Sequence, residues 1–94
     1  MDEKRFQAFL KRGGRSPSAV RRCLKFVGDY GRFLEEHCEG ITIGRAGGQE
    51  LESFVFFIEK DPKTSAKTHL KAIRYYYEFI GDEEMRVFAS NLRQ

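Results

Sequence analysis

The sequence predicts an all-α protein, a compact bundle of four to five helices, on three observations. Apolar residues recur every three or four positions through most of the chain, which is the period of a helix with one buried face. Residues that begin and end helices, namely Ser, Pro, Asp and Gly, separate these periodic stretches. No stretch alternates apolar and polar residues as a strand would, because Ile41-Thr42-Ile43 is too short and is flanked by glycine.

The helices are expected in five places, which are residues 2–12, 16–37, 49–60, 64–80 and a last helix that begins after Asp82. Ser16 precedes Pro17, as an N-cap precedes a proline in the first turn. Between the second and third helices, the glycine-rich loop 39–48 should insert Ile41 and Ile43 into the core. The apolar period predicts one core made of Leu24, Val27, Leu34, Phe54, Ile58, Leu70, Ile73 and Tyr77.

A chain of 94 residues makes one domain, so we expect residues 1–94 to fold as a single unit. Nine Phe and four Tyr supply much of its modest core. No apolar run is long enough to span a membrane, and the charged N-terminus lacks the apolar centre of a signal peptide. We therefore expect a cytoplasmic protein with no membrane partner.

The stretch 64–80 combines an apolar stripe with a basic ridge. The stripe consists of Ala66, Leu70, Ile73, Tyr77 and Ile80, and the ridge is defined here as Lys67, Lys71 and Arg74. A similar pattern occurs 46 residues earlier, where Arg21 matches Lys67 and Lys25 matches Lys71. The repetition suggests two related helical hairpins packed core to core, although any two amphipathic helices share a period. In that arrangement the matched cations should lie on one surface.

The basic residues are unevenly distributed along the chain, although the net charge is only +3. Six basic residues and no acidic one lie between Lys11 and Lys25, and four more lie between Lys63 and Arg74. Such clusters can bind nucleic-acid phosphates, so duplex DNA is the expected partner. The candidate DNA-binding residues are Lys11, Arg12, Arg15, Ser16, Arg21, Arg22, Lys25, Lys63, Lys67, Lys71 and Arg74.

No arrangement of residues predicts catalysis, a metal site or a cofactor, so the chain is not expected to be an enzyme. The glycine-rich run Gly44–Gly48 lacks the Gly-Lys-Ser/Thr ending of a phosphate-binding loop. His37 and His69 have no partner residues at metal-ligand spacing, and His69 is expected to be a satisfied, partly buried histidine. Cys23 and Cys38, on one predicted helix, would be roughly 22 Å apart, so both should remain reduced.

Two runs of residues resemble a known family. The run Ser16-Pro17-Ser18-Ala19-Val20-Arg21-Arg22-Cys23, followed by Phe33-Leu34, resembles the second helix of the SAM-like, core-binding domain of tyrosine recombinases and phage integrases. Leu70-Lys71-Ala72-Ile73-Arg74-Tyr75-Tyr76-Tyr77-Glu78-Phe79-Ile80 resembles its fourth helix. The order and spacing agree over nearly the whole chain. Ala19 and Cys23 depart from the family pattern, which often has Thr and an aromatic residue there.

The resemblance implies a SAM-like fold that binds duplex DNA through its second and fourth helices. It also implies partners, either a recombinase catalytic domain or homologous protomers. The family's catalytic Arg, Lys, His-x-x-Arg and Tyr set is absent from this chain, which implies an excised domain or a small stand-alone relative. SAM-like folds also serve in oligomerisation, so a helical protein-interaction domain without DNA affinity, with Tyr75, Phe79 and the last helix as its contact face, is the alternative.

Overall fold

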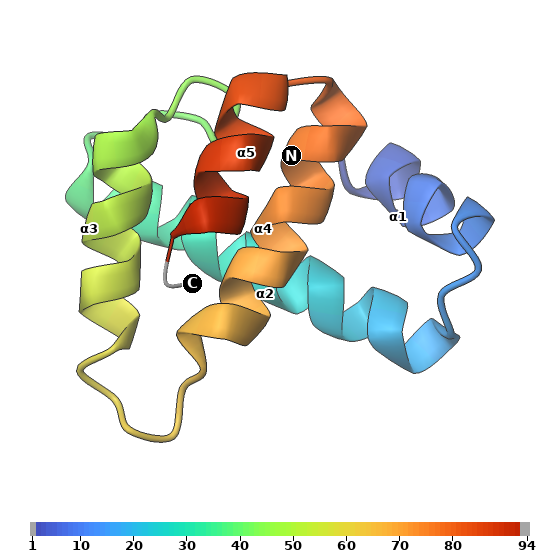
Figure 1. The fold of residues 1–94 in the computed structure, drawn as a ribbon, viewed down its shortest axis with the longest axis horizontal. Helices are drawn as coiled ribbons and strands as arrows, with labels where there is room; N and C mark the ends of the chain where they lie inside the picture. Colours follow the sequence, from blue (N-terminus) through green and yellow to red (C-terminus); the bar gives the residue numbers. More distant parts are fainter. Residues whose placement is uncertain (1, 93–94) are drawn as a thin grey trace.

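The computed structural model describes residues 2–92, and all the regular structure within them is helical (Figure 1). The five helices are α1 (Glu3–Arg12), α2 (Pro17–His37), α3 (Gly48–Ile58), α4 (Ala66–Ile80) and α5 (Glu83–Asn91). The predicted all-α fold is therefore confirmed. None of these helices has the length and apolar character needed to cross a membrane.

Local residues explain where the helices begin and end. The hydroxyl of Ser16 accepts a hydrogen bond from the Ala19 amide at 3.2 Å, and the Asp82 carboxylate accepts one from the Met85 amide at 3.1 Å. Gly81 has a φ of 77°, a left-handed conformation that glycine adopts at low cost and that terminates α4. The third helix was expected over 49–60 but spans Gly48–Ile58, because tight turn hydrogen bonds replace helical ones after it.

The centre of the molecule is the contact between α2 and α4, which cross each other steeply (Figure 1). The thiol of Cys23 donates to the Ala72 carbonyl at 3.9 Å, and further along α2 the ring of Phe26 packs on His69. Helix α1 completes one side through an aromatic cluster, in which Phe6 lies 5.1 Å from Tyr76 and 5.4 Å from Phe79.

Helix α5 packs along α4 and also contacts α3, so it lies between these two helices (Figure 1). Phe54 of α3 and His69 of α4 are in contact, with ring centroids 5.8 Å apart. Helices α3 and α4 form the second of the two expected hairpins. They touch at this point, and α5 lies between them over the rest of their length (Figure 1). The ring of Phe88 lies so close to Gly48 that a Cβ atom there would be 2.7 Å from a ring carbon. Glycine at the start of α3 thus allows α5 to approach.

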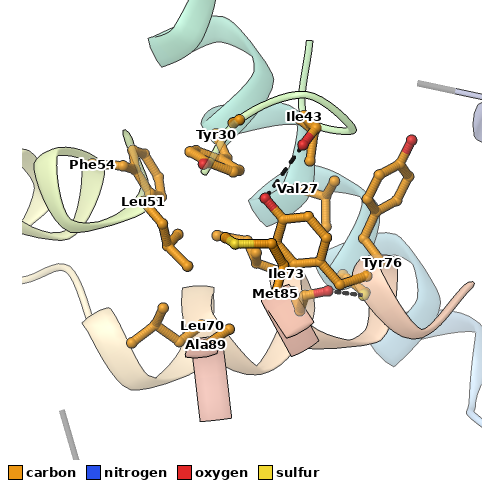
Figure 2. Close-up of a cluster of buried hydrophobic side chains, with 14 of the residues drawn as sticks. Val27, Tyr30, Ile43, Leu51, Phe54, Leu70, Ile73, Tyr76, Met85 and Ala89 are labelled. Atoms are coloured by element: carbon orange, nitrogen blue, oxygen red, sulfur yellow. Dashed lines mark hydrogen bonds between the residues drawn. The ribbon is translucent and has the colours of Figure 1, made fainter. Parts of the chain in front are cut away.

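The predicted core is confirmed except at Leu24, which is half-buried. Cys23, Val27, Tyr30 and Leu34 occupy the buried face of α2, and Leu24 lies one position to the side of this stripe. Ile80 of the predicted α4 stripe is also 39% exposed, because Tyr76 and Tyr77 take the inward positions of the last turns. Figure 2 shows this cluster, in which side chains from α2, α3, α4 and α5 meet.

The loop between α2 and α3 inserts Ile43 into the core, as predicted, while Ile41 is half-buried. The Tyr77 hydroxyl donates a hydrogen bond to the Ile43 carbonyl at 3.3 Å (Figure 2). Burial raises the pKa of Tyr77 to about 12. Both cysteines are free, as expected, and burial raises the pKa of Cys23 to about 11.

Candidate nucleic-acid interface

A groove runs between α2 and α4 where the first half of α2 passes residues 68–75 of α4. Its floor is apolar, because Ala19, Cys23, Phe26 and Ala72 lie along it. Three cations, Arg15, Arg22 and Lys71, line it together with Thr68 and the ring of Tyr75. This α2–α4 groove encloses about 200 Å³. It combines an apolar floor with cationic side chains.

Arg15 and Tyr75 form a stacked pair in this groove. The guanidinium carbon of Arg15 lies 4.0 Å from the centre of the Tyr75 ring, and its Nη1 donates to the Leu10 carbonyl at 3.5 Å. Gly13 leaves space for this guanidinium, because a Cβ atom there would collide with it. The turn after α1 therefore fixes Arg15 over the ring.

The ionisation of Tyr75 reflects the cations around it. Partial burial acts to raise its pKa, but Arg15, Lys71 and Arg74 favour the phenolate and together lower the pKa below its ordinary value. The guanidinium carbon of Arg74 lies 5.6 Å from the ring centre on the other flank. The shift shows that positive charge is concentrated around this residue.

A second groove lies between α4 and α5 and encloses about 300 Å³. Its cations are Lys67, Lys71 and Arg74, which are the whole basic ridge of α4. Leu70, Ala89, Ser90 and Leu92 line the rest of it. Because Lys71 lines this α4–α5 groove as well as the α2–α4 groove, the two form one continuous basic face.

The cations of this face have no acidic partners among residues 2–92. None of the five (Arg15, Arg22, Lys67, Lys71 and Arg74) forms an ion pair with a described carboxylate, and no described acidic residue lines either groove. Elsewhere on α2 the pattern differs, since Asp29 pairs with Lys25 at 3.3 Å and with Arg32 at 3.0 Å. The two grooves therefore bring five cations together without a described acidic residue in their lining.

The structure thus brings together five of the eleven predicted DNA-binding residues. Lys25 and Lys63 line a different hollow between α2 and α3, together with Asp29 and Glu36. The other four, Lys11, Arg12, Ser16 and Arg21, line none of these three hollows, and the Ser16 hydroxyl caps α2.

The matched cations are consequently not gathered on one surface. Lys67 and Lys71 line the α4–α5 groove, Lys25 lines the hollow between α2 and α3, and Arg21 lines none of the three. The reason is the direction of packing. Helices α2 and α4 cross steeply (Figure 1), so equivalent positions of the repeat do not face one common surface.

Tyr75 is the member of the interface that sequence reasoning missed. It lies on neither the apolar stripe nor the basic ridge of α4, and Arg15, which covers it, precedes α2 in the chain. The one available signal was its spacing, because Tyr75 follows Lys71 by four residues and therefore lies one helical turn away on the same flank.

His69 is buried and satisfied, as predicted, with 6% of its surface exposed. Its Nδ1 lies 3.0 Å from the Ser65 carbonyl, its Nε2 lies 3.3 Å from Asp29, and the rings of Phe26 and Phe54 cover it. This histidine therefore ties α4 to α2. Within residues 2–92, no group of three His, Cys, Asp or Glu side chains could hold a metal ion.

Comparisons of the chain with protein-family models, with curated proteins and with solved structures find no match. Function is therefore inferred from the residues and their geometry.

Proposed function

We propose that this domain binds duplex DNA through the continuous basic face formed by the α2–α4 and α4–α5 grooves. The observation that carries the proposal is a set of five cations, centred on Lys71, that form no ion pair with a carboxylate within residues 2–92. Lys and Arg side chains that neutralise DNA phosphates release condensed counterions, which gives affinity that depends little on sequence. Lys and Arg side chains that already form ion pairs with protein carboxylates would contribute less binding free energy to DNA.

The sequence resemblance supports the same proposal. It assigns DNA contact to the second and fourth helices of a SAM-like domain, and these are the two helices that form the α2–α4 groove. The domain would then serve as the DNA-binding module of a cytoplasmic, tyrosine recombinase-like protein. The strand-cleavage chemistry would belong to a catalytic domain or to homologous protomers, since the family's catalytic residues are absent from this chain.

The affinity expected of the isolated domain is low. With roughly five phosphate contacts, binding should be micromolar or weaker at physiological salt and should fall steeply as salt rises. Each lost phosphate contact should reduce the log–log salt slope by about 0.9.

The test is fluorescence anisotropy on unrelated short duplexes from low to moderate salt. The double variant Lys67→Ala/Lys71→Ala should weaken binding to all duplexes about equally and flatten the slope by nearly 2. The matched control is Lys4→Ala/Lys60→Ala, which removes the same charge from exposed residues outside both grooves. Equal binding by the ridge variant and the parent at every salt concentration would eliminate the proposal.

Arg74 is the residue most suited to base recognition. It is half-buried between Tyr75 and the α4–α5 groove, so its guanidinium is better fixed than the exposed lysines. Arginine contacts guanine with two hydrogen bonds in the major groove. Arg74→Ala should therefore reduce the affinity differences between duplex sequences, whereas Lys67→Ala should lower all affinities in parallel.

The alternative is a protein-interaction domain, and one observation favours it. Phe56 of α3 is 65% exposed, and Phe57 is 46% exposed although its ring packs against Phe33 and His37 of α2. Phe79, expected in the contact face of that alternative, instead packs against Phe6 and Phe9. Analytical ultracentrifugation separates the two functions, because a concentration-dependent dimer without DNA affinity would support the alternative.

A further inference from the structure

We propose that the α2–α4 groove accepts one unstacked nucleotide, so that the domain prefers duplex DNA with a single-stranded extension over blunt duplex. This inference rests on the proposed DNA binding and adds the form of DNA that is recognised. It follows from a difference between the two grooves. The α4–α5 groove supplies cations and aliphatic residues, whereas the α2–α4 groove also offers planar groups and an apolar floor.

An intact duplex exposes no apolar group that could pack against the floor of the α2–α4 groove. Ala19 and Phe26 are half-buried there beside the buried Cys23 and Ala72. A duplex presents phosphates and sugars to a protein surface, while its base faces remain stacked inside. A volume of about 200 Å³ accommodates the flat ring of a single base but not a base pair. An unstacked base could therefore bury an apolar face that duplex DNA cannot offer.

The stacked pair of Arg15 and Tyr75 provides a platform for such a base. Bases that leave the helix stack on aromatic rings and on arginine guanidinium planes. The Arg15 plane is already positioned, because the Leu10 carbonyl and the space at Gly13 fix it over the ring at 4.0 Å. Little conformational entropy would be lost when a base adds to this stack.

The charges around the platform suit the phosphates of the same nucleotide. Arg22 comes from α2 and Lys71 from α4, so cations flank the groove on both of its walls. Within the described residues, neither forms an ion pair with a carboxylate. A nucleotide whose base lies on the floor could therefore place its 5′ and 3′ phosphates near one cation each.

The experiment compares three DNA probes by fluorescence anisotropy. One is a blunt duplex, the second is the same duplex with a short single-stranded extension, and the third carries an extension of abasic nucleotides with the same number of phosphates. The parent should bind the base-containing extension at least about fivefold more tightly than the other two, given typical base–aromatic stacking. The abasic probe separates stacking from the effect of added charge.

Two variants locate the effect. Tyr75→Leu removes the aromatic platform, and Ala19→Leu fills the floor of the groove. In each variant, the ratio of the affinity for the base-containing extension to the affinity for the abasic extension should fall to about one. Phe56→Leu removes an aromatic residue that is 65% exposed on α3 and should leave the ratio unchanged. Circular dichroism establishes that each variant is folded.

The outcomes are distinct. If the parent binds all three probes equally, or if Tyr75→Leu retains the full preference, the inference is wrong while duplex binding stands. If the parent binds none of them at low salt, the proposed function itself fails.

Discussion

The hydroxyl of Tyr77 donates a hydrogen bond to the main-chain carbonyl of Ile43 at 3.3 Å, which joins the last turn of α4 to the loop between α2 and α3. Tyr77 is fully buried, and Ile43 is 6% exposed. The Ile43 carbonyl also accepts a hydrogen bond from the Ala46 amide at 3.3 Å, so the Tyr77 hydroxyl supplies a second, buried hydrogen bond to it. The bond therefore holds a glycine-rich loop in place over the core.

Tyr77→Phe tests this bond, because it removes the hydroxyl and keeps the ring. We expect it to lower the free energy of unfolding by about 0.5–1.5 kcal/mol, measured by urea denaturation. Tyr76→Phe is the control, since the Tyr76 hydroxyl forms no hydrogen bond within residues 2–92. An equal loss in both variants would show that the Ile43 contact contributes nothing specific.

Ile73 and Leu70 test the core of α4. Ile73 is completely buried and Leu70 is 5% exposed. Truncation of either to alanine should lower the free energy of unfolding by about 2–5 kcal/mol, because it removes buried methyl groups and leaves a cavity. Val87→Ala on α5, where the side chain is 42% exposed, should change stability by no more than about 0.5 kcal/mol. A similar small change at Ile73 would contradict the packing described here.

Gly48 tests the approach of α5 to α3. In Gly48→Ala the new methyl group would overlap the Phe88 ring, so we expect a loss of about 1–3 kcal/mol in thermal or urea unfolding. Combining it with Phe88→Leu should recover part of the loss. Gly28→Ala provides the opposite control, because no atom lies within 4 Å of a Cβ atom there. That substitution should stabilise α2 by about 0.5–1 kcal/mol.

Alkaline pH should destabilise the domain. Burial raises the pKa of the Cys23 thiol from its ordinary value of 9.0 to about 11, and that of Tyr77 from 10.0 to about 12. The unfolded chain loses these protons first, so stability is complete below pH 9 and falls as the pH rises to about 12. Urea midpoints measured between pH 8 and 11.5 check this. The fall should be shallower in Cys23→Ala, and a constant midpoint in the parent would refute the expectation.

Asp29→Asn should make two further cations available to DNA in the hollow beside the basic face. The Asp29 carboxylate pairs with Lys25 and Arg32, and the amide would release both cations. We expect tighter binding to unrelated duplexes and a steeper salt slope, by anisotropy. Glu52→Gln on the exposed side of α3 makes the same change in net charge away from these cations and should have a smaller effect. Equal effects of the two substitutions would mean that net charge alone is responsible.

The helices could be predicted because their signals are local. Ser16 and Asp82 cap helices through contacts with residues three positions later, and Gly81 ends α4 by its own conformation. The apolar period also identified most of the core. It failed at Leu24 because a stripe of 3.6-residue period does not decide between neighbouring positions at its edge.

The grouping of the cations could not be predicted in the same way, because it depends on how helices cross. Lys25 and Lys71 match in the sequence repeat, yet Lys25 pairs with Asp29 while Lys71 lies between two grooves. Likewise, Arg15 reaches Tyr75 across 60 residues of sequence, from a turn to a helix. Contacts of this kind depend on tertiary packing, which local patterns do not encode.

The contact between α2 and α4 has a consequence for folding kinetics. Cys23 and Ala72, which meet where these helices pack, are 49 residues apart. The α4–α5 pair is joined by a short turn, so it can form while the rest of the chain is still unfolded. The α2–α4 contact must first close a long loop. Its formation should set the folding rate. Substitutions at this contact should therefore slow folding, whereas those in the α1 aromatic cluster should mainly accelerate unfolding.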